Sequence, residues 1–268
     1  LADGRRQERS LPVLFKALLP FVGNLDRVVS KKAFSAQVKL ADEMIVSGGF
    51  EGLLTGREFV ALKLLVPMVV GPVSALTMIL MGMAVDVFRE SAAVFSLMAF
   101  VLAYLQPMMW LRGAVKRRHL SIQRALPFVL DLLTLSVEAG MDFISALQRN
   151  CKSRRLDPLN EELLRMTKEI QVGSSRKDAL RNMALRVNQS DLKSVAFALI
   201  QADELGVSIG SILRIQSEQL RSRRFDRAEK LAAEAPVKML GPLMLCIFPA
   251  VFIILLGPIL SQAMKGIF

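Results

Sequence analysis

Adjacent acidic residues, Asp203-Glu204 and Glu161-Glu162, are the first groups in this chain that could do chemistry. Neighbouring carboxylates can bind a metal ion or share acid–base work, provided that further ligands or a partner acid lie nearby. The residues around each pair supply no such partners, and the chain has a single histidine, His119, and two cysteines in different environments. The sequence also has no phosphate-binding loop and no nucleophile elbow. It therefore predicts a protein that is not an enzyme, with no catalytic, cofactor-binding or metal-binding residues.

Two acids, Glu138 and Glu204, are of interest because each stands two residues before a glycine, Gly140 and Gly206. A carboxylate in the last turn of a helix opposes the helix dipole by about 0.3–1 kcal/mol. A basic neighbour, a following helix or a partner protein must offset that cost. We favour an intramolecular salt bridge, and docking to a partner protein is the alternative.

The segments around these acids share one pattern: helix end, glycine, capping residue, new helix. Gly140 and Gly206 fit the left-handed conformation that ends many helices, and Asp142 and Ser208 can cap the helices that follow. A weaker third copy at Gly173 lies midway between them. Even spacing is typical of a helical repeat. We favour three ordinary capped turns in a bundle over a true solenoid.

Long uncharged runs interrupt this 268-residue chain, which is 53% hydrophobic. They cover residues 64–85, 91–111 and 239–264. At 1.5 Å per residue each run can cross a hydrocarbon layer of about 30 Å, and prolines within membrane helices are tolerated. The sequence predicts three transmembrane helices, the first two forming a hairpin. Buried helices of a soluble core are the disfavoured alternative.

Basic residues flank these runs on one side and give the chain a net charge of +11. By the positive-inside rule, the N-terminal segment and the region between the second and third runs are cytoplasmic, and the C-terminus lies on the periplasmic side. Trp110 beside Arg112 is typical of an interfacial anchor. An aromatic content of 6% leaves few stacking platforms for bases, so nucleic acid is not an expected partner, whereas anionic lipid is.

Apolar residues between the second and third runs follow helical periodicity, and no segment alternates with a period of two. We expect an all-α membrane protein with a cytoplasmic antiparallel helical bundle. Residues 126–137 are apolar on most sides and should form its most buried helix. The predicted organisation is an N-terminal cytoplasmic segment at 1–57, a transmembrane hairpin at 58–111, the helical domain at 112–235 and a C-terminal transmembrane helix at 236–268.

Several segments together resemble the type II secretion F-domain family. They are Leu126-Pro127, Asp131-Leu132-Leu133, Glu138-Ala-Gly140 with Leu147, Gly173 with Ala179-Leu180, 201–206 with Ile209 and Leu213, and the arginine-rich helix through Arg224. The ending, residues 235–258, is similar to TadC-like platform proteins of tight-adherence (Tad/Flp) pili. The resemblance covers about residues 121–264.

The resemblance implies a bacterial inner-membrane platform that couples a cytoplasmic hexameric secretion ATPase to pilin extraction and fibre assembly. Implied partners are a TadB-like second platform protein, the ATPase, pilin subunits and membrane lipid, with the chain in a homo- or hetero-oligomer. The F-type platform of a type II secretion system is the alternative, and a transporter or channel subunit is disfavoured because the uncharged runs lack ionisable residues. Partner-binding candidates are Glu138, Gly140, Glu204, Gly206, Arg221, Arg223 and Arg224, and candidates for a pilin groove are Pro242, Pro249 and Pro258.

Overall fold

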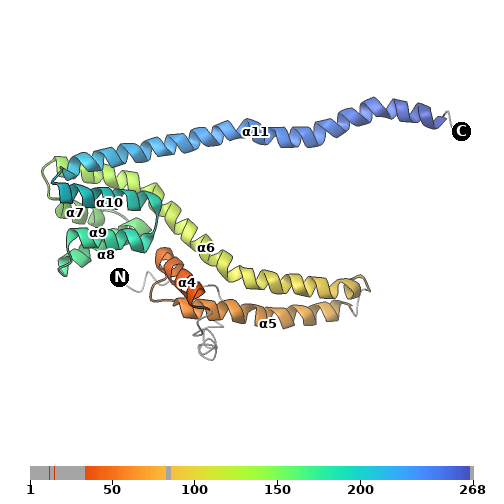
Figure 1. Ribbon diagram of the computed structural model, residues 1–268, viewed down its shortest axis with the longest axis horizontal. Coiled ribbons are helices and arrows are strands. Elements are labelled where there is room, and N and C mark those ends of the chain that lie inside the picture. The colour runs from red at the N-terminus through yellow and green to blue at the C-terminus, as the bar shows by residue number, and fades with distance from the viewer. Residues whose placement is uncertain (1–11, 13–14, 16–33, 83–85, 266–268) are drawn as a thin grey trace. The chain divides into compact units, whose positions relative to one another are not determined.

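The computed structural model describes residues 12, 15, 34–82 and 86–265 (Figure 1). Every regular element in this part of the chain is an α-helix, which confirms the all-α class. The elements are α4 (Ser35–Gly48), α5 (Gly56–Gly82), α6 (Asp86–Glu138), α7 (Phe143–Ser153), α8 (Pro158–Gln171), α9 (Arg176–Val187), α10 (Ser190–Leu205) and α11 (Ile209–Lys265). The chain divides into two compact units, Leu1–Arg214 and Ile215–Phe268. Much of the predicted N-terminal segment 1–57 lies outside the described residues.

The first unit begins with α4 packed against a helical hairpin of α5 and the first part of α6. Thr55 and Glu58 form the capping box that starts α5, because each backbone N–H donates to the other side chain, at 2.7 and 3.3 Å. A buried apolar cluster joins the three helices and includes Ile45, Phe59 and Leu111. We refer to α4, the turn after it and this hairpin as the hairpin module.

Trp110 is half-buried and packs against the core of the hairpin module. Its ring lies 5.2 Å from the rings of both Phe15 and Phe50, edge-on to the first. The interfacial anchoring expected from its neighbour Arg112 stays a prediction.

The rest of the first unit is an antiparallel bundle of the last part of α6, α7, α8, α9, α10 and the first residues of α11. Side-chain oxygens start its helices: Asp142, Asp157 and Ser175 accept bonds from backbone N–H groups of α7, α8 and α9. Pro158 stands at the start of α8, where a missing N–H costs nothing. The buried stripes predicted from periodicity meet in the centre, among them Leu159, Met166, Leu180, Ala184, Val195 and Leu199.

Residues 126–137 form the end of the 53-residue helix α6. Leu126, Val129 and Leu133 face the bundle core, and only Phe128 and Leu135 of this segment are exposed. The segment is therefore well buried, as its apolar composition predicts, and one narrow stripe is left exposed.

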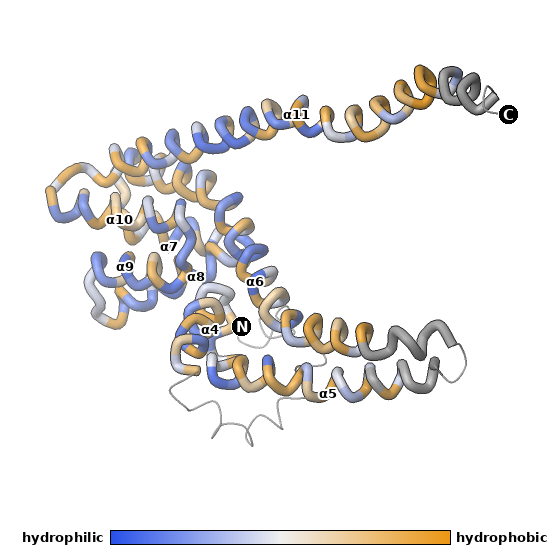
Figure 2. The backbone as a smooth tube through the Cα atoms, turned by 45° about the vertical axis from the view of Figure 1, so that its right-hand side comes forward, coloured by the Kyte–Doolittle hydropathy of each residue, from blue (hydrophilic) through white to orange (hydrophobic). Residues whose placement is uncertain are grey.

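Two helices among the described residues are long and apolar enough to cross a membrane, Val94–Glu138 and Ile209–Pro258. Few of their apolar window residues are buried, unlike those of a soluble core helix. Figure 2 shows the hydrophobic residues concentrated in the α5–α6 hairpin and in the C-terminal half of α11. The predicted run 91–111 lies in α6 and the run 239–264 lies in α11. The run 64–85 extends past α5 into residues outside the described part, so the number of three spans stays a prediction.

The second unit is the remainder of α11. This helix continues through Pro236, Pro242, Pro249 and Pro258 as one element. Its side chains are almost all exposed as far as Pro258.

Candidate functional site

Three glycine turns lie at one end of the bundle, because α6, α8 and α10 all end there and α7, α9 and α11 all begin there (Figure 1). Gly140, Gly173 and Gly206 have φ angles of 89°, 109° and 69°, as the sequence pattern predicts. A side chain at these angles is strained, which explains the residue type. We call this surface the turn end of the bundle.

Ion pairs connect neighbouring turns at this end. Glu138 accepts from Arg214 at 3.1 Å, and Glu204 pairs with Lys177. Arg176 lies 3.3 Å from Asp203 and 3.8 Å from a carboxylate oxygen of Asp142. The turns are thereby tied to one another by side chains from four helices.

Glu138 and Glu204 both have an intramolecular basic partner, which confirms the favoured interpretation of these acids. The hydrogen bond from Lys177 and its positive charge lower the pKa of Glu204. Docking of a partner protein at these acids stays a prediction.

Apolar side chains are exposed at the turn end. Val172 is 90% exposed, Leu205 77% and Val207 44%. Each stands beside a turn glycine in the sequence, and this position is the signal from which their exposure could be predicted. Exposed apolar groups surrounded by charged pairs are typical of a protein-binding surface.

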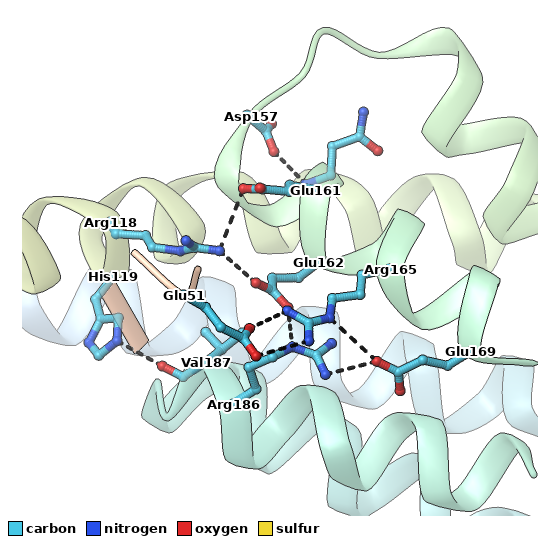
Figure 3. A network of polar contacts seen from close by, with 11 residues as sticks. Glu51, Arg118, His119, Asp157, Glu161, Glu162, Arg165, Glu169, Arg186 and Val187 are labelled. Atoms are coloured by element: carbon cyan, nitrogen blue, oxygen red, sulfur yellow. Dashed lines mark hydrogen bonds and ion pairs between the residues drawn. The ribbon is translucent and has the colours of Figure 1, made fainter. Parts of the chain in front are cut away.

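A second group of charged residues lies inside the bundle (Figure 3). Glu162 of α8 accepts from Arg118 of α6 at 2.6 Å and from Arg186 of α9 at 2.8 Å, and all three side chains are about nine-tenths buried. Glu169 accepts from Arg186 at 2.8 Å, and Glu161 lies 3.6 Å from Arg118. This buried network holds three helices in register, since burial of each charge requires its partners.

The network continues to the hairpin module through Glu51. Its carboxylate accepts two bonds from the Arg165 guanidinium, at 2.5 and 3.4 Å. This hydrogen bond lowers the pKa of Glu51 and raises that of Arg165. Arg118 and Arg186, the partners of Glu161-Glu162, lie at distant positions in the chain, so the residues that neighbour these acids in sequence do not reveal them.

His119 and Cys151 are structural. The ring Nε2 of His119 lies 2.9 Å from the carbonyl oxygen of Val187, the last residue of α9, and burial lowers the histidine pKa. Burial raises the pKa of Cys151 to about 11, so its thiol stays protonated. No group of three potential metal ligands occurs among the residues that the structure describes.

The remaining candidates lie on α11, outside the first unit. Arg221, Arg223 and Arg224 are exposed on its polar part, and Pro242 and Pro249 are exposed within its apolar part. The acids at the turn end belong to the first unit, and the arginines and prolines belong to the second. The described residues of each unit offer surfaces for binding.

Residues 129–257 match the family model described as "Type II secretion system (T2SS), protein F". Proteins of this family are membrane platforms of secretion and type IV pilus-related machines, and they are generally not enzymes. Comparison with curated proteins and with solved structures gave no match. The matched range takes in the bundle from α6 onward and most of α11.

Proposed function

We propose that this chain, which carries a type II secretion system protein F domain, is the inner-membrane platform of a Tad-type pilus assembly machine. The platform couples a cytoplasmic hexameric secretion ATPase to the extraction of pilin from the bilayer and its addition to the fibre. The observation that carries the proposal is the F-domain match over a helical bundle and a long apolar helix that exposes its side chains.

The turn end of the bundle is the surface that we assign to the ATPase. Val172 and Leu205 offer apolar contact area, and the ion pairs around them hold the three turns in one arrangement. Because the three turns join one end of each of six helices, a push on one of them reaches the whole bundle. This assignment includes the predicted docking residues Glu138, Gly140, Glu204 and Gly206.

A TadB-like platform protein and pilin are the proposed partners in the membrane. The apolar part of α11 exposes its side chains around Pro242 and Pro249, where missing backbone N–H groups leave carbonyl oxygens without helical partners. Small and helix-breaking residues let a neighbouring helix approach closely in lipid. In this proposal a pilin helix or the second platform protein packs there, and Arg221, Arg223 and Arg224 face the cytoplasmic side.

Co-purification with the ATPase of the same machine tests the assignment. Leu205→Asp and Val172→Asp should reduce the amount of ATPase recovered with the membrane-inserted protein about tenfold, because each puts a charge into an apolar contact. Leu156→Asp is the matched control, since Leu156 is also exposed but lies between α7 and α8, at the other end of the bundle.

Unchanged recovery with both turn-end variants would sink the assignment of this surface. Charge reversal at Glu204 and at Arg224 then separates the two predicted docking regions. Loss of binding only with Arg224→Glu would move the ATPase contact to the polar part of α11.

The printed family description favours a second candidate, the F-type platform of a type II secretion system. The two differ in the ATPase and the fibre subunit that they bind. Recovery of a type II secretion ATPase in preference to a Tad ATPase, when both are offered in equal amounts, would favour the second candidate.

A further inference from the structure

The two sides of α4 have different contacts. Toward α5 and α6 the packing is dry and close: a Cβ added at Gly48 would meet Phe50 at 3.1 Å and Val115 at 3.3 Å. At Gly56 an added Cβ would lie 2.5 Å from the Asp42 carboxylate. The helix is therefore firmly attached to the hairpin module.

Toward the bundle, α4 contacts α9 in part, and two cavities with charged and apolar lining lie between α4 with its turn and the bundle helices. One of about 250 Å³ lies beside Glu51 and Arg165, and one of about 480 Å³ lies between Asp42 and Glu43 on one side and Arg186 and Lys193 on the other. Cavities of this size and polarity hold water. The contact between the hairpin module and the bundle is therefore wet.

Charges across this wet contact are complementary. The hairpin module contributes Asp42, Glu43 and Glu51. The bundle contributes four basic residues, Arg118, Arg165, Arg186 and Lys193, together with Glu161 and Glu162, which pair with Arg118 and Arg186. The Glu51–Arg165 pair bridges the two sides, and its side chains are 47% and 46% exposed. An ion pair this accessible to water changes an equilibrium by about fivefold at most. Such a contact opens far more readily than the buried apolar cluster on the other side of α4.

We propose that the acidic face of α4 and its turn forms an electrostatic latch with Arg165 of α8, Arg186 of α9 and Lys193 of α10. The latch opens and closes while the hairpin module and the bundle each stay folded. When it is closed, Glu51 and Arg165 fix the direction of the hairpin relative to the bundle. When it is open, α6 is the continuous helix that still connects the two. The inference goes beyond the proposed function and holds whichever ATPase binds.

Distance measurements between two nitroxide labels test the latch in the full chain in lipid nanodiscs. The labels are placed at Ala36→Cys on α4 and Asn182→Cys on α9, both exposed positions, with Cys246→Ser to remove the exposed native thiol. At about 0.15 M salt the parent protein should give one main distance. At about 1 M salt, where charges are screened beyond roughly 3 Å, a second, longer distance should gain population several-fold.

Glu51→Arg should populate the longer distance at low salt, about tenfold over the parent, because attraction across the contact becomes repulsion. The exchange of both charges, Glu51→Arg with Arg165→Glu, should restore the parent distribution. Lys168→Glu is the control for charge on α8, since Lys168 is exposed on that helix away from both cavities.

Two results would overturn the latch. One is a Glu51→Arg distribution identical to that of Lys168→Glu. The other is a double exchange that does not restore the parent distances, since that would assign the change to local damage. Neither outcome bears on ATPase binding, so failure of the latch and failure of the proposed function are distinguishable.

Discussion

Removal of the charge on Glu162 is the sharpest test of how the bundle is held together. This carboxylate lies between two guanidinium groups, with its Oε1 2.6 Å from Arg118 Nη2 and its Oε2 2.8 Å from Arg186 Nε. Glu162→Gln keeps the shape of the side chain and removes the negative charge. Two buried positive charges are then left facing a neutral amide.

The expected loss of stability depends on which acidic partners Arg118 and Arg186 keep after the substitution. Breaking a buried ion pair by removing one partner costs about 3–5 kcal/mol. Arg186 keeps Glu169 at 2.8 Å and Arg118 keeps Glu161 at 3.6 Å, so the lower end of that range applies. A loss of about 3 kcal/mol corresponds to a fall in Tm of about 6–12 °C for a domain of this size.

Thermal unfolding of the detergent-solubilised chain, followed by far-UV circular dichroism, measures the effect. Glu161→Gln is the matched control, because this neighbour on the same helix is 19% exposed and lies farther from Arg118. It should cost about 1 kcal/mol or less. Equal Tm values for Glu162→Gln and Glu161→Gln would refute the reasoning that burial makes the Glu162 pairs matter.

Two glycines give a further test. Gly206→Ala should destabilise the chain by about 1 kcal/mol, since alanine is strained at a φ of 69°. Gly210→Ala should raise the Tm of the chain, because Gly210 lies within helix α11 and an added Cβ would have an ordinary clearance of 3.5 Å. Equal melting curves for the two variants would contradict this prediction. Burial lowers the pKa of His119 in the folded chain, so on acidification the unfolded chain binds a proton at this histidine before the folded chain does. The contribution of His119 to stability should therefore be complete above a pH of about 6.5 and fall as the pH is lowered. Thermal melts between pH 7 and 5 should show a smaller fall in Tm for His119→Gln than for the parent. Cys151, with a pKa of about 11, should resist maleimide at pH 8 until the protein unfolds; labelling at the same rate with and without denaturant would be the contrary result.

Local features of the fold could be predicted from the sequence because their signals lie within a few residues. The turn glycines and the cap at Asp142 lie where the pattern places them. The Asp157-Pro158 start of α8 and the Thr55–Glu58 capping box are signals of the same local kind. Each depends on one helix end and its nearest side chains. Helical periodicity likewise gave the buried stripes of the bundle.

Contacts between distant residues could not be predicted in this way. Arg118 meets Glu162 across 44 positions, and Arg165 meets Glu51 across 114. The aromatic rings that Trp110 contacts, Phe15 and Phe50, also come from other segments. The turn-end residues Val172 and Leu205 were missed for a related reason, since periodicity places apolar residues inside and does not mark those left uncovered.

The length of α6 means that a small rotation of this helix produces a large displacement of its ends. Its 53 residues span both the hairpin module and the bundle as one helix. At 1.5 Å per residue this is a rod of about 80 Å, so a tilt of roughly 5° about its middle moves each tip by about 3.5 Å. Pro107 and Pro127 each remove a backbone hydrogen bond from the rod and make it more compliant at two points. A small rotation at the bundle is therefore converted into a displacement at the far tip as large as the width of a side-chain contact.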